Sequence, residues 1–152
     1  MLATLGRLEV ASNPQLTQIS GLAATSISGD VTLRGNPVLA TIGSMSSLTS
    51  IGGALVVDDN DALVDLTNLI PAGMNRISGG LTISNNARIT GLGKLTTMLD
   101  GITGNVTITS NPTLSICSAI VVDHCAQVGT TAAVISGNSG TQNNCGNCWC
   151  GR

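Results

Sequence analysis

A short phrase recurs along this chain of 152 residues, and each copy ends in an asparagine. The phrase reads ISGDVTLRGN at 27–36, ISGGLTISNN at 77–86 and ITGNVTITSN at 102–111. The asparagines in this position are 23 to 27 residues apart: Asn13, Asn36, Asn60, Asn86, Asn111 and Asn138. A repeat of this period is typical of solenoid proteins, in which each unit forms one coil and stacks on its neighbours.

Apolar residues alternate with other residues just before each asparagine. The alternating pairs are Leu8/Val10, Val31/Leu33, Leu55/Val57, Leu81/Ile83, Val106/Ile108 and Ala133/Ile135. Alternation with a period of two predicts a strand with one buried face. Apolar residues also follow three and nine positions after each of the first five asparagines, so each coil is expected to have further buried sides.

An isoleucine stands nine residues before four of the asparagines, and a glycine follows it two positions later. These glycines are Gly29, Gly53, Gly79 and Gly104. A glycine at a constant position predicts a backbone corner that needs a positive φ or close packing. The length variation of the full repeats falls just before the isoleucine, in gaps of 5, 6, 8 and 7 residues. A solenoid tolerates insertions at one edge, because a loop there bulges outward.

The repeated asparagine has a structural role in this interpretation. A strand that turns sharply inside a coil leaves backbone groups without partners, and each buried unpaired group costs about 1–3 kcal/mol. An asparagine side chain offers both a donor and an acceptor, so a column of them predicts an internal hydrogen-bonded ladder. Pro14, Pro37 and Pro112 directly follow ladder asparagines and disfavour the helical conformation there. A single such motif would indicate only a surface Asn-Pro turn.

The core must be built from aliphatic side chains, because the chain has no Phe, no Tyr and one Trp. Charged residues make up 9% of the chain and the net charge is −2, without the clustered Lys and Arg of a nucleic-acid-binding surface. No apolar run reaches the ~18 residues of a membrane span. The first ten residues lack the pattern of a signal peptide.

The phrase L-x-I-x-x-N-P-x-L-x-x-I-x-x-L, with Ile-x-Gly before it, resembles the receptor L-domain family. These proteins are leucine-rich-repeat-like, right-handed β-solenoids of growth-factor receptor ectodomains and of bacterial surface proteins. The likeness covers residues 4–145, and the lack of aromatic residues brings it closer to the bacterial kind. Repeat and resemblance together predict a mostly β, single right-handed solenoid domain of about six coils over 1–152, with repeats over 1–114 and a last coil and cysteine-rich cap over 115–152.

A short helix is expected to cap the C-terminal end. Apolar residues and cysteines recur at three- and four-residue steps over 117–128, and Ser115 is a suitable N-cap residue. Such a helix would cover the apolar end of the last coil, as the terminal units of solenoids must.

Five cysteines lie in the last quarter of the chain: Cys117, Cys125, Cys145, Cys148 and Cys150. Their crowding predicts disulfides in an oxidising compartment, and the resemblance implies the pair Cys117–Cys145. Cys117 and Cys125 should not pair on one helix, because eight residues span about 12 Å and a disulfide needs less than about 7 Å. Cys125 would then pair with Cys148 or Cys150, which leaves one thiol over. A zinc-like site of His124 with these cysteines is the alternative.

The outward residues of the strands form the expected binding face of the solenoid. The candidate residues are Glu9, Thr32, Arg34, Asp58, Thr82, Ser84, Thr107 and Thr109. Only Arg34 among them is of a type that dominates protein interfaces. The threonines raise ice binding as a remote alternative, although charged residues and Val56 interrupt their rows.

The acidic cluster Asp58, Asp59, Asp61 and Asp65 is the one candidate calcium site. Its spacing does not match an EF-hand loop and Asn60 belongs to the ladder, so a solvated acidic corner is favoured. Catalysis finds little support: the chain has one histidine, next to Asp123, and adjacent residues do not orient each other as a triad requires.

The N-terminal coil is expected to be uncovered, because Gly6 already occupies the corner position seven residues before Asn13. An uncovered strand is a template for pairing, so another protein or further copies of the chain are the expected partners. These patterns predict a non-enzymatic extracellular or cell-surface module for protein interaction or adhesion, without a cofactor. The alternative is a structural subunit that assembles end to end into fibres.

Overall fold

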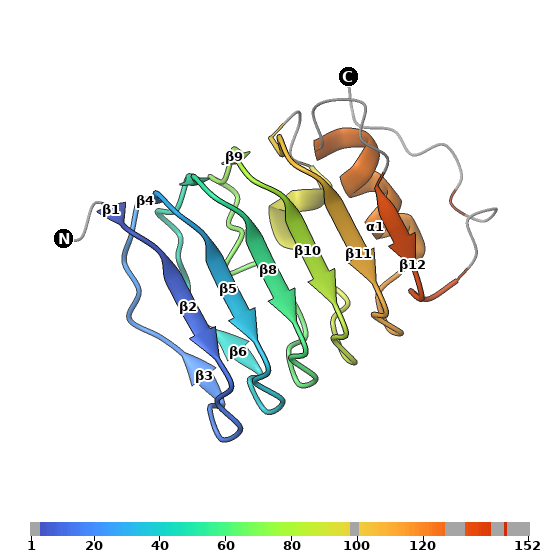
Figure 1. The fold of residues 1–152 in the computed structure, drawn as a ribbon, viewed down its shortest axis with the longest axis horizontal. Coiled ribbons are helices and arrows are strands. Elements are labelled where there is room, and N and C mark those ends of the chain that lie inside the picture. The colour runs from blue at the N-terminus through green and yellow to red at the C-terminus, as the bar shows by residue number, and fades with distance from the viewer. Residues whose placement is uncertain (1–3, 98–100, 127–132, 141–144, 146–152) are drawn as a thin grey trace.

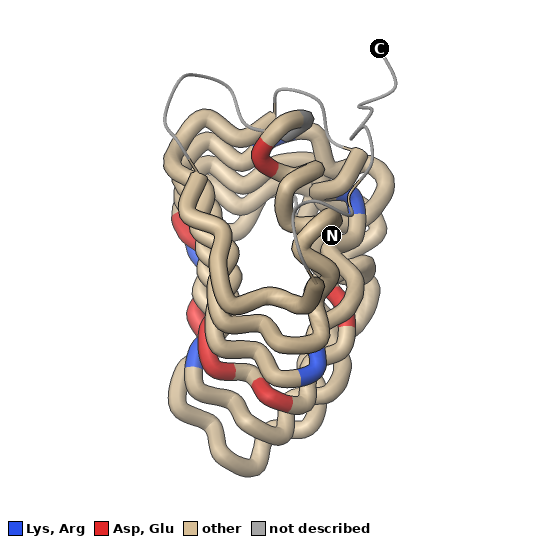
Figure 2. The backbone as a smooth tube through the Cα atoms, turned by 90° about the vertical axis from the view of Figure 1, so that its right-hand side faces the viewer, with Lys and Arg blue, Asp and Glu red and all other residues tan. Residues whose placement is uncertain are grey.

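The computed structural model describes residues 4–97, 101–126, 133–140 and 145, which form a β-solenoid (Figure 1). Its coils lie one behind another around a shared interior, as the view along the stack shows (Figure 2). The stack amounts to about five turns and carries six strands on its main side. The predicted mostly β solenoid is thereby confirmed.

The main side of the stack is a parallel sheet in which neighbours in space are neighbours in the repeat. Its strands are β2 (Leu8–Ala11), β5 (Val31–Arg34), β8 (Leu55–Asp58), β10 (Leu81–Ser84), β11 (Val106–Thr109) and β12 (Val134–Ser136). The register follows the repeat, so that Leu8 lies beside Val31 and Leu55 beside Leu81. Equivalent side chains of successive coils therefore stand in straight rows.

The other sides of the coils contain shorter elements. One sheet contains β1 (Thr4–Leu5), β4 (Ser26–Ile27), β7 (Ser50–Ile51) and β9 (Arg76–Ile77), and another contains β3 (Gln18–Ile19) and β6 (Thr41–Ile42). The remaining elements are the 3-10 helix η1 (Gly93–Thr96), the helix α1 (Ile116–Val121) and the π-helical turn η2 (Val122–Ala126).

The helix α1 forms the expected C-terminal cap, but it is shorter than the pattern predicts. Ser115 caps it, since its Oγ accepts a hydrogen bond from the amide of Cys117 at 3.3 Å. The α-helix ends at Val121, and the next turn is π-helical. There Nδ1 of His124 donates to the carbonyl oxygen of Ile120 at 2.9 Å. This is the acceptor that the His124 amide would use in an α-helix, so the ring competes with the backbone where the helix widens.

The interior is filled by aliphatic rows. The inward residues of the four middle strands are all 0% exposed: Val31, Leu33, Leu55, Val57, Leu81, Ile83, Val106 and Ile108. Among the described residues, the buried polar side chains are those of Asn36, Asn60, Asn86 and Asn111, also 0% exposed. Four amides inside an aliphatic tube require hydrogen-bond partners.

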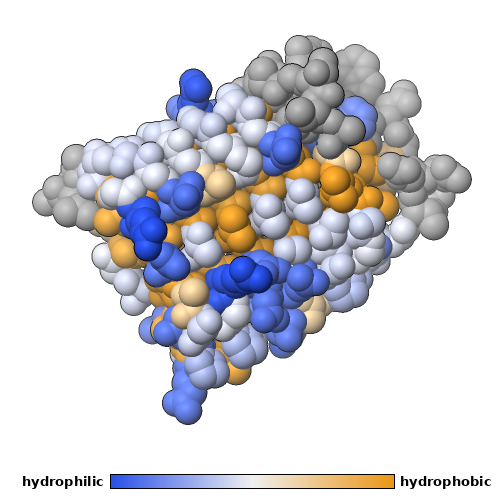
Figure 3. All heavy atoms as spheres, viewed as in Figure 1, coloured by the Kyte–Doolittle hydropathy of each residue, from blue (hydrophilic) through white to orange (hydrophobic). Residues whose placement is uncertain are grey.

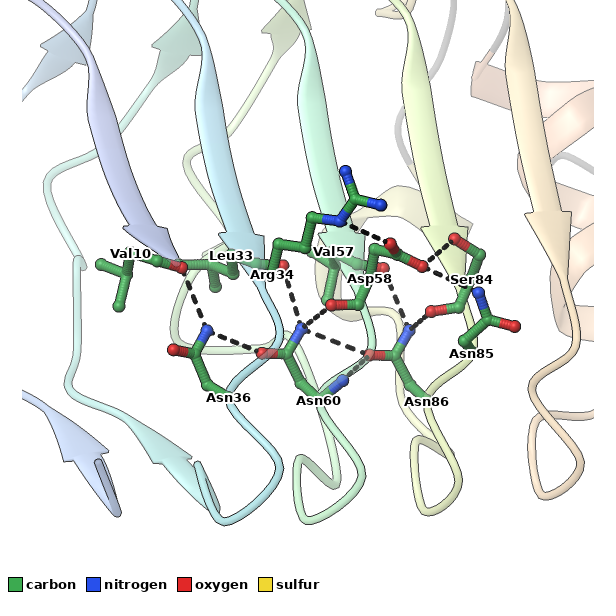
Figure 4. A network of polar contacts seen from close by, with 10 residues as sticks. All are labelled: Val10, Leu33, Arg34, Asn36, Val57, Asp58, Asn60, Ser84, Asn85 and Asn86. Carbon is green, nitrogen blue, oxygen red and sulfur yellow. Dashed lines mark hydrogen bonds and ion pairs between the residues drawn. The ribbon is translucent and has the colours of Figure 1, made fainter. Parts of the chain in front are cut away.

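Each of these asparagines bonds to both neighbouring coils, as Figure 4 shows for Asn36 and Asn60. The Nδ2 of Asn60 donates to the carbonyl of Leu33 in the preceding coil at 2.9 Å and to that of Asp58 in its own coil at 2.9 Å. Its Oδ1 accepts from Nδ2 of Asn36 at 3.0 Å, and its backbone amide donates to Oδ1 of Asn86 at 3.1 Å. The asparagine ladder expected from the repeat is therefore present.

The ladder runs through all six predicted asparagines. It begins at Asn13, whose backbone amide donates to Oδ1 of Asn36 at 3.1 Å. It ends at Asn138, whose Oδ1 accepts from Nδ2 of Asn111 at 3.2 Å. The middle members are buried, Asn138 is partly buried and Asn13 is exposed.

A second row of special residues, directly before the ladder, was not predicted. The residue preceding each ladder asparagine has a positive φ between 54° and 65°: Ser12, Gly35, Asp59, Asn85, Ser110 and Gly137. This left-handed conformation turns the chain from the strand into the ladder corner. The sequence signal was present, since only Gly, Asn, Asp and Ser occupy the position and no β-branched residue does.

The constant glycines act through close packing and not through a positive φ. A Cβ on Gly29, Gly53, Gly79 or Gly104 would lie 2.5–2.8 Å from a backbone atom of a neighbouring coil. The amide of Gly53 donates to the carbonyl of Gly29 at 3.1 Å, and that of Gly79 to Gly53 at 2.9 Å. The second of the two explanations offered by the sequence is thus the correct one.

Replacing Asn60 with Ala should lower the free energy of unfolding by about 3–5 kcal/mol, because several buried groups lose their partners together. Chemical denaturation measures this loss. Asn13→Ala is the matched control at the exposed end of the ladder, and it should cost about 1 kcal/mol or less. Equal losses for the two variants would contradict the ladder's role.

Replacing Asp59 with Val should destabilise the fold by about 1–2 kcal/mol, because a β-branched residue resists the left-handed conformation. Asp59→Gly should leave stability unchanged or raise it slightly. Asp61→Val removes the same charge two residues away, at a position without a positive φ, and controls for it. The thermal midpoints of the three variants separate backbone strain from lost charge. If Asp61→Val lowers the midpoint as much as Asp59→Val does, backbone strain is not the cause.

Candidate interaction face

The outward side chains of the main sheet form the candidate interaction face. Its members are Glu9, Ala11, Thr32, Arg34, Val56, Asp58, Thr82, Ser84, Thr107, Thr109, Val134 and Ser136. None of them is buried. Figure 3 views this side of the molecule, where apolar patches alternate with polar ones. All the outward residues named from the sequence belong to this one face.

A polar network lies across the middle of the face (Figure 4). Nε of Arg34 lies 3.1 Å from Oδ2 of Asp58 on the next strand. Oδ1 of Asp58 accepts hydrogen bonds from Oγ of Ser84 at 2.7 Å and from Nδ2 of Asn85 at 2.9 Å. The Asp58 side chain is 14% exposed and that of Arg34 is 68% exposed. The carboxylate is therefore fixed by three residues from the two coils on either side of its own.

This network orients Arg34 without using all of its hydrogen-bonding groups. Nε is the nitrogen that lies against Asp58. Within the part of the chain that the structure describes, the two terminal nitrogens make no hydrogen bond, so they remain for another group. A guanidinium presents its donors in a planar fork that matches a carboxylate. The neighbouring strand positions carry the small side chains of Thr32 and Val56, which leave access to the fork open.

The hydroxyl rows of the face are incomplete. Thr82 lies beside Thr107, and Ser84 lies beside Thr109. Val56 and Asp58 follow in the same rows on β8. On the other side, Ser136 continues one row beside Thr109, whereas Val134 interrupts the other beside Thr107. The two rows carry hydroxyls together only on β10 and β11, which gives the ice-binding alternative a small area.

The acidic cluster is not arranged as a cation site. Asp58 is bound to Arg34, as described above, and Oδ1 of Asp65 accepts from the amide of Thr67 at 2.8 Å. Oδ1 of Asp61 is 3.4 Å from the amide of Ala87. Among the described residues, no group of three or more His, Cys, Asp or Glu side chains comes together in a way that could hold a metal ion.

A disulfide joins the cap to the chain beyond the last strand. Cys117 on α1 is bonded to Cys145, with 5.1 Å between the two Cα atoms. This is the pair that the family resemblance implies. The side chain of Cys125 and the whole of Cys148 and Cys150 lie outside the described residues, and so does the pairing proposed for them.

The one histidine is engaged within the cap. Nδ1 of His124 donates to its own helix, and Oδ2 of Asp123 lies 3.8 Å from the same nitrogen. The described contacts of His124 thus lie within the cap itself.

Comparisons with protein-family models, with curated proteins and with solved structures found no match to this chain. In the described part of the chain, no helix has the length and the apolar character that crossing a membrane requires.

Replacing Cys117 with Ser should lower the free energy of unfolding by about 3–4 kcal/mol, because the bond closes a sequence separation of 28 residues. Denaturation of the parent chain in reductant should give at least this loss, because reductant opens Cys117–Cys145 together with any further disulfide. Peptide mapping by mass spectrometry would locate the bond directly. A parent chain whose stability is unchanged by reductant would contradict this expectation.

Proposed function

We propose that this chain is a non-enzymatic interaction module that works outside the cell or on a cell surface, in the manner of receptor L-domain proteins. The observation that supports this proposal best is the candidate interaction face. It is a continuous six-stranded surface without a buried member, in which one cation is held in place. Solenoids generally bind their partners on such extended faces.

The proposed partner is a protein that presents a carboxylate to Arg34. The arginine is already oriented by Asp58, so binding loses little side-chain freedom. Arginine is one of the residue types enriched at the centre of protein interfaces. The small residues around it favour a partner that approaches closely over several strands.

The proposed location rests on the disulfide. Bonds such as Cys117–Cys145 form and persist in oxidising compartments and are rare in the cytosol. The low charge of the chain and the hydrogen bonds that join its coils agree with a rigid scaffold that presents the candidate interaction face.

The test is a screen of the oxidised protein against purified extracellular domains by surface plasmon resonance. A partner of the candidate interaction face should bind the Arg34→Ala variant about tenfold more weakly, or worse. Arg76→Ala is the matched control, because Arg76 is also exposed and donates from Nε to Oγ of Ser78, but on β9. Partners whose affinity falls equally with both variants, or turnover of a tested substrate, would refute the proposal.

A further inference from the structure

The N-terminal coil exposes residues whose equivalents in the middle coils are buried. Leu5, Leu8, Val10 and Ile19 are only partly buried. The residues at the same positions of the next coil, Ile27, Val31, Leu33 and Ile42, are 0–4% exposed. The end of the stack therefore presents an apolar surface on the described part of the chain.

The edge of β2 also offers backbone hydrogen bonds. The amides of Leu8 and Ser12 donate to the carbonyls of Asp30 and Arg34 on the side of β5. Backbone groups of a strand alternate in direction, so the amides of Glu9 and Ala11 point to the opposite edge. An open parallel edge of this kind invites another strand.

Two opposite charges lie along this edge. Arg7 and Glu9 stand two residues apart and form an ion pair with each other, with side chains 73% and 50% exposed. Two residues is the spacing that places both side chains on the same face of a strand. An antiparallel strand with the same two residues would therefore meet them with the charges reversed.

We propose that the N-terminal coil is the interface for a second copy of this chain, docked head to head. In the register that we assign, β2 pairs antiparallel with β2 of the second copy and Leu8 faces its own counterpart across a two-fold axis. Arg7 of each copy then faces Glu9 of the other, so that two ion pairs form. In the same register, the backbone N–H and C=O groups of Glu9, which point to the open edge, face the backbone of Arg7 in the second copy.

The alternative head-to-tail contact is less well matched. It would bring β2 against β12, and Val134–Ser136 has no charged residue to complement Arg7 and Glu9. At that end, the helix α1 takes the place of the short strands of the earlier coils (Figure 1). A two-fold pairing closes on itself, as most soluble oligomers do, and does not lead to fibres.

The first measurement is the mass of the parent chain by light scattering over a wide range of concentrations. A dimer of twice 15.2 kDa is expected. A monomer at all concentrations would overturn the proposal, and so would a series of growing oligomers, which indicates head-to-tail stacking.

Charge reversal tests the register. Arg7→Glu and Glu9→Arg should each weaken dimerisation about tenfold or more, since attraction becomes repulsion twice in each dimer. The double variant Arg7→Glu/Glu9→Arg should restore the parent affinity. Arg76→Glu makes the same charge change on β9, away from this edge, and should have no effect. Failure of the double variant to recover would overturn the assigned pairing.

A cross-link tests the same register independently. Facing residues of a non-hydrogen-bonded antiparallel pair have Cα atoms about 4.5 Å apart, within the range of a disulfide. Leu8→Cys should therefore give a covalent dimer under oxidising conditions, beyond any seen with the parent chain. Glu9→Cys should not, because Glu9 faces Arg7 and not itself. Equal cross-linking of the two variants would overturn the proposed dimer. This result is independent of whether a partner binds the candidate interaction face.

Discussion

The structure depends on the hydrogen bonds of one amide side chain per coil. Each buried asparagine carries a donor group, an acceptor and a backbone amide into an aliphatic interior, where unpaired polar groups are expensive. The contacts of Asn60 with Asn36 and Asn86 satisfy these groups only if neighbouring coils stand at one fixed height and angle. The ladder thus sets the stacking distance and register, and the aliphatic rows supply most of the stabilising burial.

The ladder, the left-handed corner and the tight glycines form one mechanism for turning the chain. The strand is followed by a residue such as Asp59, with a φ of 57°. The next residue is the ladder asparagine, which points its amide inward. At the other end of the strand, Gly53 lets the backbones of two neighbouring coils approach at a distance that no Cβ would allow. Because every coil repeats this turn, the main sheet is continuous and its outward residues form one face.

Much of this fold could be predicted from the sequence, because a repeat multiplies weak signals. One Asn-Pro dipeptide indicates a turn, whereas six asparagines in register indicate a buried column. The left-handed row before the ladder was missed, since Ser12 or Ser110 gives no hint of a positive φ when each is considered alone. The π-helical turn was missed for another reason: it depends on the contact between His124 and the Ile120 carbonyl, which a periodicity does not reveal.

The candidate site was predicted as a set of residues, but not as an arrangement. Position in the repeat correctly placed Arg34 and Asp58 on the outward face. Their ion pair also follows from the register, since both residues stand two positions before a ladder asparagine. Along the chain, however, Asp58 lies next to Asp59 and Asp61 and was therefore grouped with them. In a solenoid, the same position one coil away is often a closer neighbour than the next residue but one.

The middle coils are alike on the two surfaces by which they stack on their neighbours. The unit from one corner glycine to the next presents the same hydrogen-bonding groups above and below. Duplication or loss of one whole unit therefore leaves two surfaces that already match, without new side chains at the junction. Gain of a whole coil is the change in length that this fold tolerates best, and the candidate interaction face lengthens with each coil.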